Sequence, residues 1–224
     1  MALDWVAVWL TVKLAALSVA ALFVVGTPVA WWLAHNRSWL RVVIEAVVAL
    51  PLVLPPIVLG FYLLILLGPL GPVGAFWVEV TGGALTFSFE GLVFASVLYS
   101  LPFVVQPLQG AFEAVGRRPL EAAATLRAAP LDAFLTVACP MAVRGFVTGA
   151  VLGFAHTLGE FGVVLMVGGS IPGETKVVSI ALFEQVETMD YAGAHALSAL
   201  LLAFSFAVLV VVYALNRRFP VRVG

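Results

Sequence analysis

The sequence predicts an all-α integral membrane protein with about five transmembrane helices. Hydrophobic residues make up 63% of the 224 residues, whereas charged residues make up only 10%. Soluble domains are about 45–50% apolar and about 25% charged, so this chain lacks the polar residues needed to cover a water-soluble surface. Two further observations support a membrane protein. The sequence contains five long apolar stretches, and the basic residues are unevenly distributed between the segments that connect them.

Each apolar stretch is long enough to cross a bilayer core of about 30 Å, which takes roughly 20 helical residues. The stretches are expected to be helical because lipid offers no partner to a free backbone N–H or C=O group. The predicted spans are 14–33, 42–67, 92–112, 141–167 and 197–215.

Two connections on one side of the membrane have distinct compositions. The segment 69–89 is rich in glycine and proline and is expected to be a turn-rich connection. The segment 175–188 is apolar but short, and it carries Glu184 and Glu187. It favours a short outer helix or a re-entrant turn over a sixth span.

Basic residues are concentrated in alternate connections. Nine of the eleven lie there: Arg37, Arg41, Arg117, Arg118, Arg127, Arg144, Arg217, Arg218 and Arg222. The positive-inside rule then predicts a multi-pass protein of the inner (plasma) membrane, with its N-terminus outside and its C-terminus in the cytoplasm. The formal net charge of −1 argues against a nucleic-acid partner.

The loop between the third and fourth predicted spans carries two helix-start signals. Pro119 and Pro130 each suit the first turn of a helix, where the missing N–H breaks no helical hydrogen bond. Glu121 and Asp132 then fall in those first turns, where a carboxylate complements the helix dipole. We expect two short helices with a break near Ala129. Such a loop suits either docking into a groove of another protein or lying on the lipid headgroups.

The same loop resembles the "EAA" signature of ABC importer permeases, through Glu121-Ala122-Ala123 and a proline at the matching distance, Pro140. The family pattern is Glu-Ala-Ala, three residues, Gly, nine residues, Ile, any residue, Leu-Pro. Three positions depart from it, with Arg127 for glycine, Val137 for isoleucine and Cys139 for leucine. Arginine at position 127 has a steric cost if that residue adopts a positive φ. This departure affects the shape of the predicted turn and not its location.

Three further segments are similar to the molybdate, tungstate and sulfate branch of these permeases. They are 50–60 (LPLVLPPIVLG), 158–162 (LGEFG) and 171–175 (IPGET). Within that branch, the resemblance favours molybdate, with tungstate and sulfate or thiosulfate as alternatives.

The resemblance implies a type I ABC importer permease architecture, with 1–224 as one transmembrane domain and a cytoplasmic coupling loop at about 113–136. It also implies a homodimer in the lipid bilayer, two ABC ATPase subunits that bind ATP with Mg²⁺, and an extracytoplasmic binding protein that delivers the oxyanion. By resemblance, the residues expected to dock on the ATPase are Glu121, Ala122, Ala123, Arg127, Pro130 and Pro140.

This chain itself is expected to hold no cofactor, metal or catalytic residue. The segment 168–175 has the glycine spacing of a P-loop, but Glu174 stands where the phosphate-binding lysine would be. The single cysteine, Cys139, lacks the companion residues of a metal site. No protease or hydrolase motif supports an enzyme within the membrane. A secondary transporter or channel that works without an ATPase stays open as the alternative class.

Residues with polar or distorting character inside the predicted spans are candidates for the translocation path or gate. His156 and Glu160 are four residues apart and share one helical face, as either a polar gate or a buried structural pair. Glu160 is not expected to bind an oxyanion, because a carboxylate repels it. Proline residues at 51, 55 and 56 are expected to distort the second span. The full candidate set is Pro55, Pro56, His156, Gly159 and Glu160.

The fourth predicted span also carries Gly145, Gly149 and Gly153 at every fourth position. This small-residue stripe predicts close approach of another helix.

Overall fold

The computed structural model describes residues 4–218, and in that range it contains helices and connections without any strand. The all-α prediction is therefore confirmed. Arg222, the last of the predicted cytoplasmic arginines, lies outside the described residues. Within residues 4–218, three helices are long and apolar enough to cross a membrane. That number rises to five if each of two bent pairs is one span, namely Trp39–Val53 with Pro56–Leu67 and Pro130–Met141 with Val143–Gly159. This agrees with the predicted number of about five.

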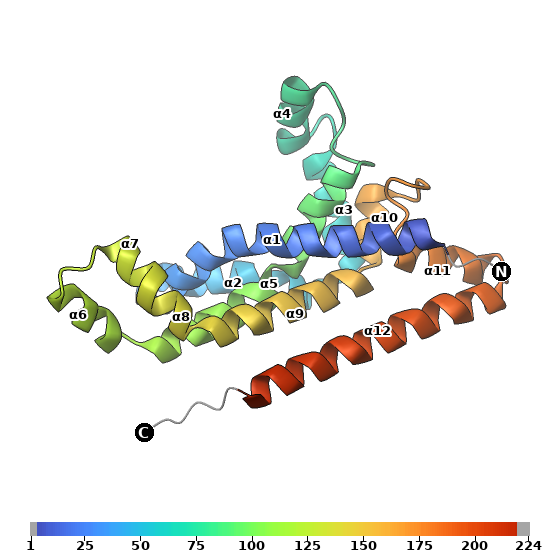
Figure 1. Ribbon diagram of the computed structural model, residues 1–224. Coiled ribbons are helices and arrows are strands. Elements are labelled where there is room, and N and C mark those ends of the chain that lie inside the picture. The colour runs from blue at the N-terminus through green and yellow to red at the C-terminus, as the bar shows by residue number, and fades with distance from the viewer. Residues whose placement is uncertain (1–3, 219–224) are drawn as a thin grey trace.

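Three long helices form the centre of the bundle (Figure 1). They are α1 (Trp5–His35), α5 (Phe89–Val115) and α9 (Val143–Gly159), and each contacts the other two. Their shared core contains the fully buried side chains of Leu22, Val104 and Phe112. The last long helix, α12 (Tyr191–Arg218), runs beside α9 and α11, and its residues 191–210 are mostly exposed.

The glycine stripe on α9 packs against α5. A Cβ added at Gly145 would lie 2.5 Å from the Cβ of Ala111, and one added at Gly153 would lie 2.9 Å from Val104 Cγ2. Real Cβ atoms do not approach other atoms this closely, so the two helices depend on hydrogen at these positions. The predicted close packing is confirmed.

The second predicted span is not one helix. It divides into α2 (Trp39–Val53) and α3 (Pro56–Leu67), which are bent by 115° relative to each other. Leu54 and Pro55 are extended between them, with ψ of 136° and 134°. The physical reason is the proline pair, because a residue before proline avoids the α conformation and proline itself donates no hydrogen bond. Pro51, by contrast, lies within α2.

The distortion predicted for the second span is therefore present, whereas the fourth predicted span, 141–167, is wrong as a continuous helix. α9 ends at Gly159, Glu160 is extended (φ −63°, ψ 131°), and α10 (Gly162–Gly168) begins two residues later. No proline lies at this break. Partners outside the helix hold Glu160 instead, as described below. α8 (Cys139–Met141) precedes α9 as a separate short turn.

The second halves of the two broken spans pack on each other. A Cβ on Gly60 of α3 would lie 2.9 Å from the Cβ of Met166 in α10. A Cβ on Gly162 would lie 3.0 Å from the Cβ of Pro56. The helix breaks at 54–55 and 160–161 are therefore brought side by side.

Two short helices lie in the connections far from the Glu121 loop. α4 (Pro72–Thr81) projects from the bundle in Figure 1 and was not predicted, because its glycine-rich flanks indicated only turns. Pro72 begins it, and Gly82 ends it with φ +76°, a conformation that favours glycine. α11 (Val178–Glu187) confirms the short helix expected between 175 and 188.

The Glu121 loop forms the two short helices expected from its prolines. They are α6 (Arg118–Thr125) and α7 (Pro130–Ala133), separated by residues 126–129. A π-helical turn, η1 (Phe134–Ala138), leads back toward α8 and the bundle. Figure 1 shows α6 and α7 beyond one end of the long helices, which we call the α6–α7 end.

Candidate functional site

The first candidate site is the projecting loop at the α6–α7 end. Pro119 lies in the first turn of α6, and Pro130 is the first residue of α7. Glu121 and Asp132 occupy the first turns of these helices, where the helix dipole favours a negative charge. The break therefore lies where the sequence predicted it.

Arg127 occupies the turn with φ +62°. This is the left-handed region, which costs a non-glycine residue about 1 kcal/mol or more. The turn is held by backbone hydrogen bonds, from Arg127 N–H to Ala124 O at 2.9 Å and from Ala128 N–H to Ala123 O at 3.1 Å. The position where the family pattern has glycine thus has the conformation that glycine suits best, and the arginine is strained there.

The loop presents apolar side chains to its surroundings. Leu126 is 84% exposed and Leu131 is 67% exposed, on either side of the break. Glu121 and Ala122 are also exposed, whereas Ala123 is buried. The two leucines were missed in the sequence analysis, although apolar residues beside a turn in a polar loop are a signal for a partner surface.

Pro140 does not lie on the projecting loop. It is in α8, where the chain returns to the bundle, and its side chain is exposed. The structure therefore brings Glu121, Ala122, Arg127 and Pro130 together and leaves Pro140 at the base.

The second candidate site is a cavity of about 470 Å³ where the two helix breaks meet. Its walls come from α3, α5, α9 and α10, and the residues that line it are Pro56, Ile57, Tyr99, Ala155, His156, Gly159, Glu160, Phe161 and Gly162. Four of the five predicted path residues are in this set. The fifth, Pro55, lies next to it in the first break and does not line it. Residues about 100 positions apart in the sequence are therefore brought to one place.

Glu160 is held by hydroxyl groups from two other helices. Its side chain is fully buried, and it accepts hydrogen bonds from Ser96 Oγ at 2.5 Å and Ser100 Oγ at 2.8 Å on α5. Its backbone oxygen accepts a hydrogen bond from Ser179 Oγ of α11 at 2.5 Å. A buried charge needs such partners to be tolerated. These bonds hold Glu160 outside the helical path and explain why α9 ends there.

His156 is connected to Glu160 through Ser100. His156 Nδ1 lies 2.9 Å from Ser100 Oγ and 3.5 Å from Glu160 Oε1. Because the Ser100 hydroxyl donates its one proton to the carboxylate, it accepts from His156 Nδ1, which carries a proton in this arrangement. The imidazole also stacks on Phe103, with ring centroids 3.9 Å apart. The predicted pairing of His156 and Glu160 is thus present, with a serine between them.

The arrangement fixes the broken helix, and the Ser100 hydroxyl donates its proton to Glu160 and not to the neighbouring His156. Among residues 4–218, no group of three or more His, Cys, Asp or Glu side chains is placed to hold a metal ion. Ser96 and Ser100 were missed in the sequence analysis, because small hydroxyl residues within an apolar span carry no signal of their own.

Comparison with known proteins decides the family. Residues 26–221 match the family model described as "Binding-protein-dependent transport system inner membrane component". The chain belongs to this family of transport permeases.

Relatives with similar sequences support the same assignment for this permease. It is 60% identical to the molybdenum transport system permease protein ModB of Azotobacter vinelandii, over 96% of this chain and 95% of that protein. It is 35% identical to ModB of Escherichia coli K12, over 83% of this chain and 81% of that protein. It is also 35% identical to the sulfate permease CysT of Salmonella typhimurium, over 95% of this chain and 77% of that protein.

Solved structures share the fold of the permease. A bacterial ABC transporter that imports alginate matches with a TM-score of 0.76, at 16% identity, over 99% of this chain and 82% of that chain. The inward-facing methionine transporter MetNI matches with a TM-score of 0.69, at 19% identity, over 95% and 94% of the two chains. The predicted ABC importer permease fold and the resemblance to the molybdate branch are confirmed.

Proposed function

We propose that this chain is the permease subunit of an ATP-driven importer that carries molybdate across the inner membrane. The observation that carries the proposal is the 60% identity to a molybdate permease over almost the whole length of both chains. Sulfate is an alternative cargo, supported by the 35% identity to a sulfate permease. Tungstate and thiosulfate are further alternatives that rest on the sequence resemblance alone.

The energy comes from a separate subunit in this proposal. Two copies of the chain form a homodimer, and the α6–α7 loop of each docks on one ABC ATPase that binds ATP with Mg²⁺. The exposed Leu126 and Leu131 support docking, because apolar side chains grouped on a protein surface mark protein–protein interaction sites. The acidic Glu121 beside them adds charge that a basic groove would match. The permease itself catalyses no reaction.

The cavity at the helix breaks forms part of the anion path in this proposal. Irregular backbone at membrane depth is tolerated where it is buried or lines a cavity. His156 faces this cavity with an 18% exposed side chain, whereas the Glu160 carboxylate is turned toward the serines of α5. A carboxylate shielded by hydroxyl groups suits the passage of an oxyanion, because its negative charge is turned away from the path. Pro55 and Gly159, at the two breaks, allow the walls to move as a gate.

The two ends of the bundle lie on opposite sides of the membrane in this proposal. The N-terminus lies outside, and the α6–α7 end and the C-terminus lie in the cytoplasm, as the arginines indicate. An extracytoplasmic binding protein delivers the anion to the opposite face, where α11 lies (Figure 1).

The test compares anions on the reconstituted complex of permease, ATPase and binding protein. Molybdate on the binding protein is expected to stimulate ATP hydrolysis and uptake at lower concentration than tungstate or sulfate. A lower requirement for sulfate would assign the chain to the alternative cargo. Uptake of molybdate down a gradient by proteoliposomes that hold this chain alone would support a channel and contradict the ATP-driven function.

A further inference from the structure

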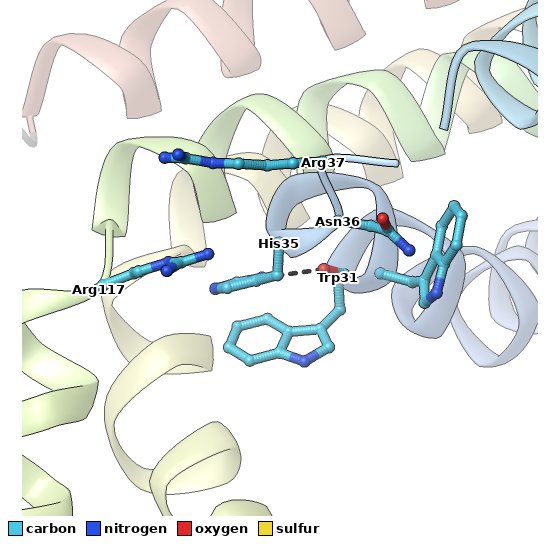
Figure 2. A pocket seen from close by; sticks show the side chains of 6 residues that line it. Trp31, His35, Asn36, Arg37 and Arg117 are labelled. Carbon is cyan, nitrogen blue, oxygen red and sulfur yellow. Dashed lines mark hydrogen bonds between the residues drawn. The ribbon is translucent and has the colours of Figure 1, made fainter. Parts of the chain in front are cut away.

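A second cavity, of about 430 Å³, lies at the α6–α7 end, away from the helix breaks. It is formed where α1 ends and where the chain passes from α5 into α6. The residues that line it are Trp31, Trp32, His35, Asn36, Arg37 and Arg117. We call it the Trp–Arg pocket (Figure 2).

Within residues 4–218, no carboxylate lines the Trp–Arg pocket itself. Glu113 lines the adjoining cavity together with Arg37 and Arg117, and it is already paired with Arg41. Among the described residues, neither Arg37 nor Arg117 forms an ion pair. Arg41 differs, because it bonds Glu45 at 2.8 Å and Glu113 at 2.6 Å. Two unneutralised arginines on one cavity repel each other and favour an anion between them.

His35 is oriented by the backbone of its own helix. Its Nδ1 lies 2.9 Å from Trp31 O, and since a carbonyl only accepts, Nδ1 carries the proton. The other ring nitrogen is directed toward Arg117 in Figure 2, and both guanidinium groups lie on the side of the pocket where this ring ends. The His35 ring also packs on Trp31, with centroids 3.9 Å apart. The polar groups therefore converge on one side of a firm aromatic wall.

The aromatic residues indicate the depth of the pocket in the membrane. Trp31 and Trp32 lie in the last turns of α1, and Trp39, 77% exposed, begins α2. Tryptophan gathers at the level of the lipid headgroups, and basic pockets between transmembrane helices bind acidic headgroups. A guanidinium group offers a planar fork that matches two phosphate oxygens.

We propose that the Trp–Arg pocket binds the phosphodiester headgroup of an anionic phospholipid, held by Arg37 and Arg117 against the tryptophan wall. A lipid fits better than a free ion, because the pocket combines cations with an apolar wall that a glycerol backbone can contact. Arg117 directly precedes α6, so the bound lipid ties the end of α1 to the start of the loop helices.

Native mass spectrometry of the detergent-purified permease–ATPase complex tests the proposal. Phosphatidylglycerol is titrated against phosphatidylcholine as the zwitterionic control. Arg37→Gln and Arg117→Gln are each expected to weaken phosphatidylglycerol binding about fivefold, the effect of about one basic residue at an anionic surface. Arg117→Lys is expected to lose less than Arg117→Gln, because it keeps the charge.

Arg144→Gln is the matched control, since it removes one positive charge from the start of α9 without touching the pocket. It should leave the affinity unchanged. Equal retention of phosphatidylcholine, or equal weakening by Arg144→Gln, would overturn the site. Displacement of the lipid by inorganic phosphate or molybdate at the same concentration would show that the pocket binds a small anion, and it would contradict the proposed lipid site. Unchanged thermal unfolding of the lipid-free variants shows that any loss of binding is not a loss of folding.

Discussion

Single side chains decide where the helices of this permease end. Glu160 is the clearest case, because a carboxylate buried within an apolar bundle must keep its hydrogen bonds. Ser96 and Ser100 on α5 supply them to the side chain, and Ser179 bonds its backbone oxygen. The same residue thus ends α9 and joins it to α5 and α11.

Glu160→Ala is therefore expected to destabilise the permease. It leaves two buried serine hydroxyls without their charged acceptor, and hydrogen bonds to charged groups contribute about 1.5–3 kcal/mol each. We expect a clearly lower thermal unfolding midpoint in detergent. Glu174→Ala, at an exposed glutamate between α10 and α11, is the control and should have the same unfolding midpoint as the unsubstituted protein. Equal midpoints for the two variants would contradict the structural role of Glu160.

Arg127 is also a strained residue, because a φ of +62° is unfavourable for any residue with a Cβ. Arg127→Gly is expected to stabilise the turn by up to about 1 kcal/mol. Ala124→Gly, inside α6, is the matched control and should cost about 1 kcal/mol, since glycine is a poor helix former. Hydrogen exchange of the Arg127 and Ala128 amides measures both. Faster exchange in Arg127→Gly than in the unsubstituted protein would show that the arginine side chain contributes more than its strain costs.

Among the helices, the sequence predicted a break only where a residue near the break, such as proline, disfavours the helix. The prolines at 55 and 56 indicated a distortion of the second span, and α3 begins there. The break at Glu160 carries no proline, and its cause lies in serines 60 and 64 positions away. α4 was missed for the opposite reason, since glycines and prolines around it resemble a long turn. A local sequence pattern does not show which distant segments of the chain will be in contact.

The turn between α10 and α11 is expected to depend on pH. Lys176 and the Ser170 hydroxyl both bond the Glu184 carboxylate, and they hold the pKa of Glu184 below its ordinary value of 4.5. A lowered pKa in the folded state means that this contribution to stability is complete above the unfolded value. It is lost as the pH falls through the folded value, so the effect is confined to the acid range below about 4.5.

Hydrogen exchange across residues 170–184 tests this expectation, once corrected for the intrinsic effect of pH on exchange. Protection should be constant near neutral pH and fall in the acid range. Glu184→Gln should flatten that dependence. Glu187→Gln should retain it, because Glu187 is exposed and forms no ion pair with any residue that the structure describes. If hydrogen exchange in the two variants depended on acid pH in the same way, Glu184 would not be the cause of the pH dependence.

At the scale of the whole molecule, composition and charge predicted the membrane class, the approximate number of spans and the projecting loop. Each of these features depends on whether a segment lies in lipid or in water, and the composition of the segment itself determines that. The cavity at the helix breaks depends instead on α3 and α10 packing through Gly60 and Gly162, which no single segment specifies. The candidate path residues were therefore found one by one, and their common cavity was not.

Transport requires that force from the ATPase reach that cavity through the α6–α7 loop. If the α6–α7 loop is the docking surface, Leu126→Asp should reduce co-purification of the ATPase about tenfold or more, because a charge replaces a central apolar contact. Leu126 is 84% exposed, so the permease itself should fold as before. Molybdate uptake by the complex should fall in parallel with ATPase binding.

Val80→Asp on α4 is the matched control, since Val80 is also an exposed aliphatic side chain, at 66%. It lies in a different connection and should leave the ATPase bound. Normal ATPase binding and uptake in Leu126→Asp would place the docking surface elsewhere. Loss of uptake with the ATPase still bound would separate docking from coupling, because the motor would then hold the loop without moving the helix breaks more than 25 residues away in sequence.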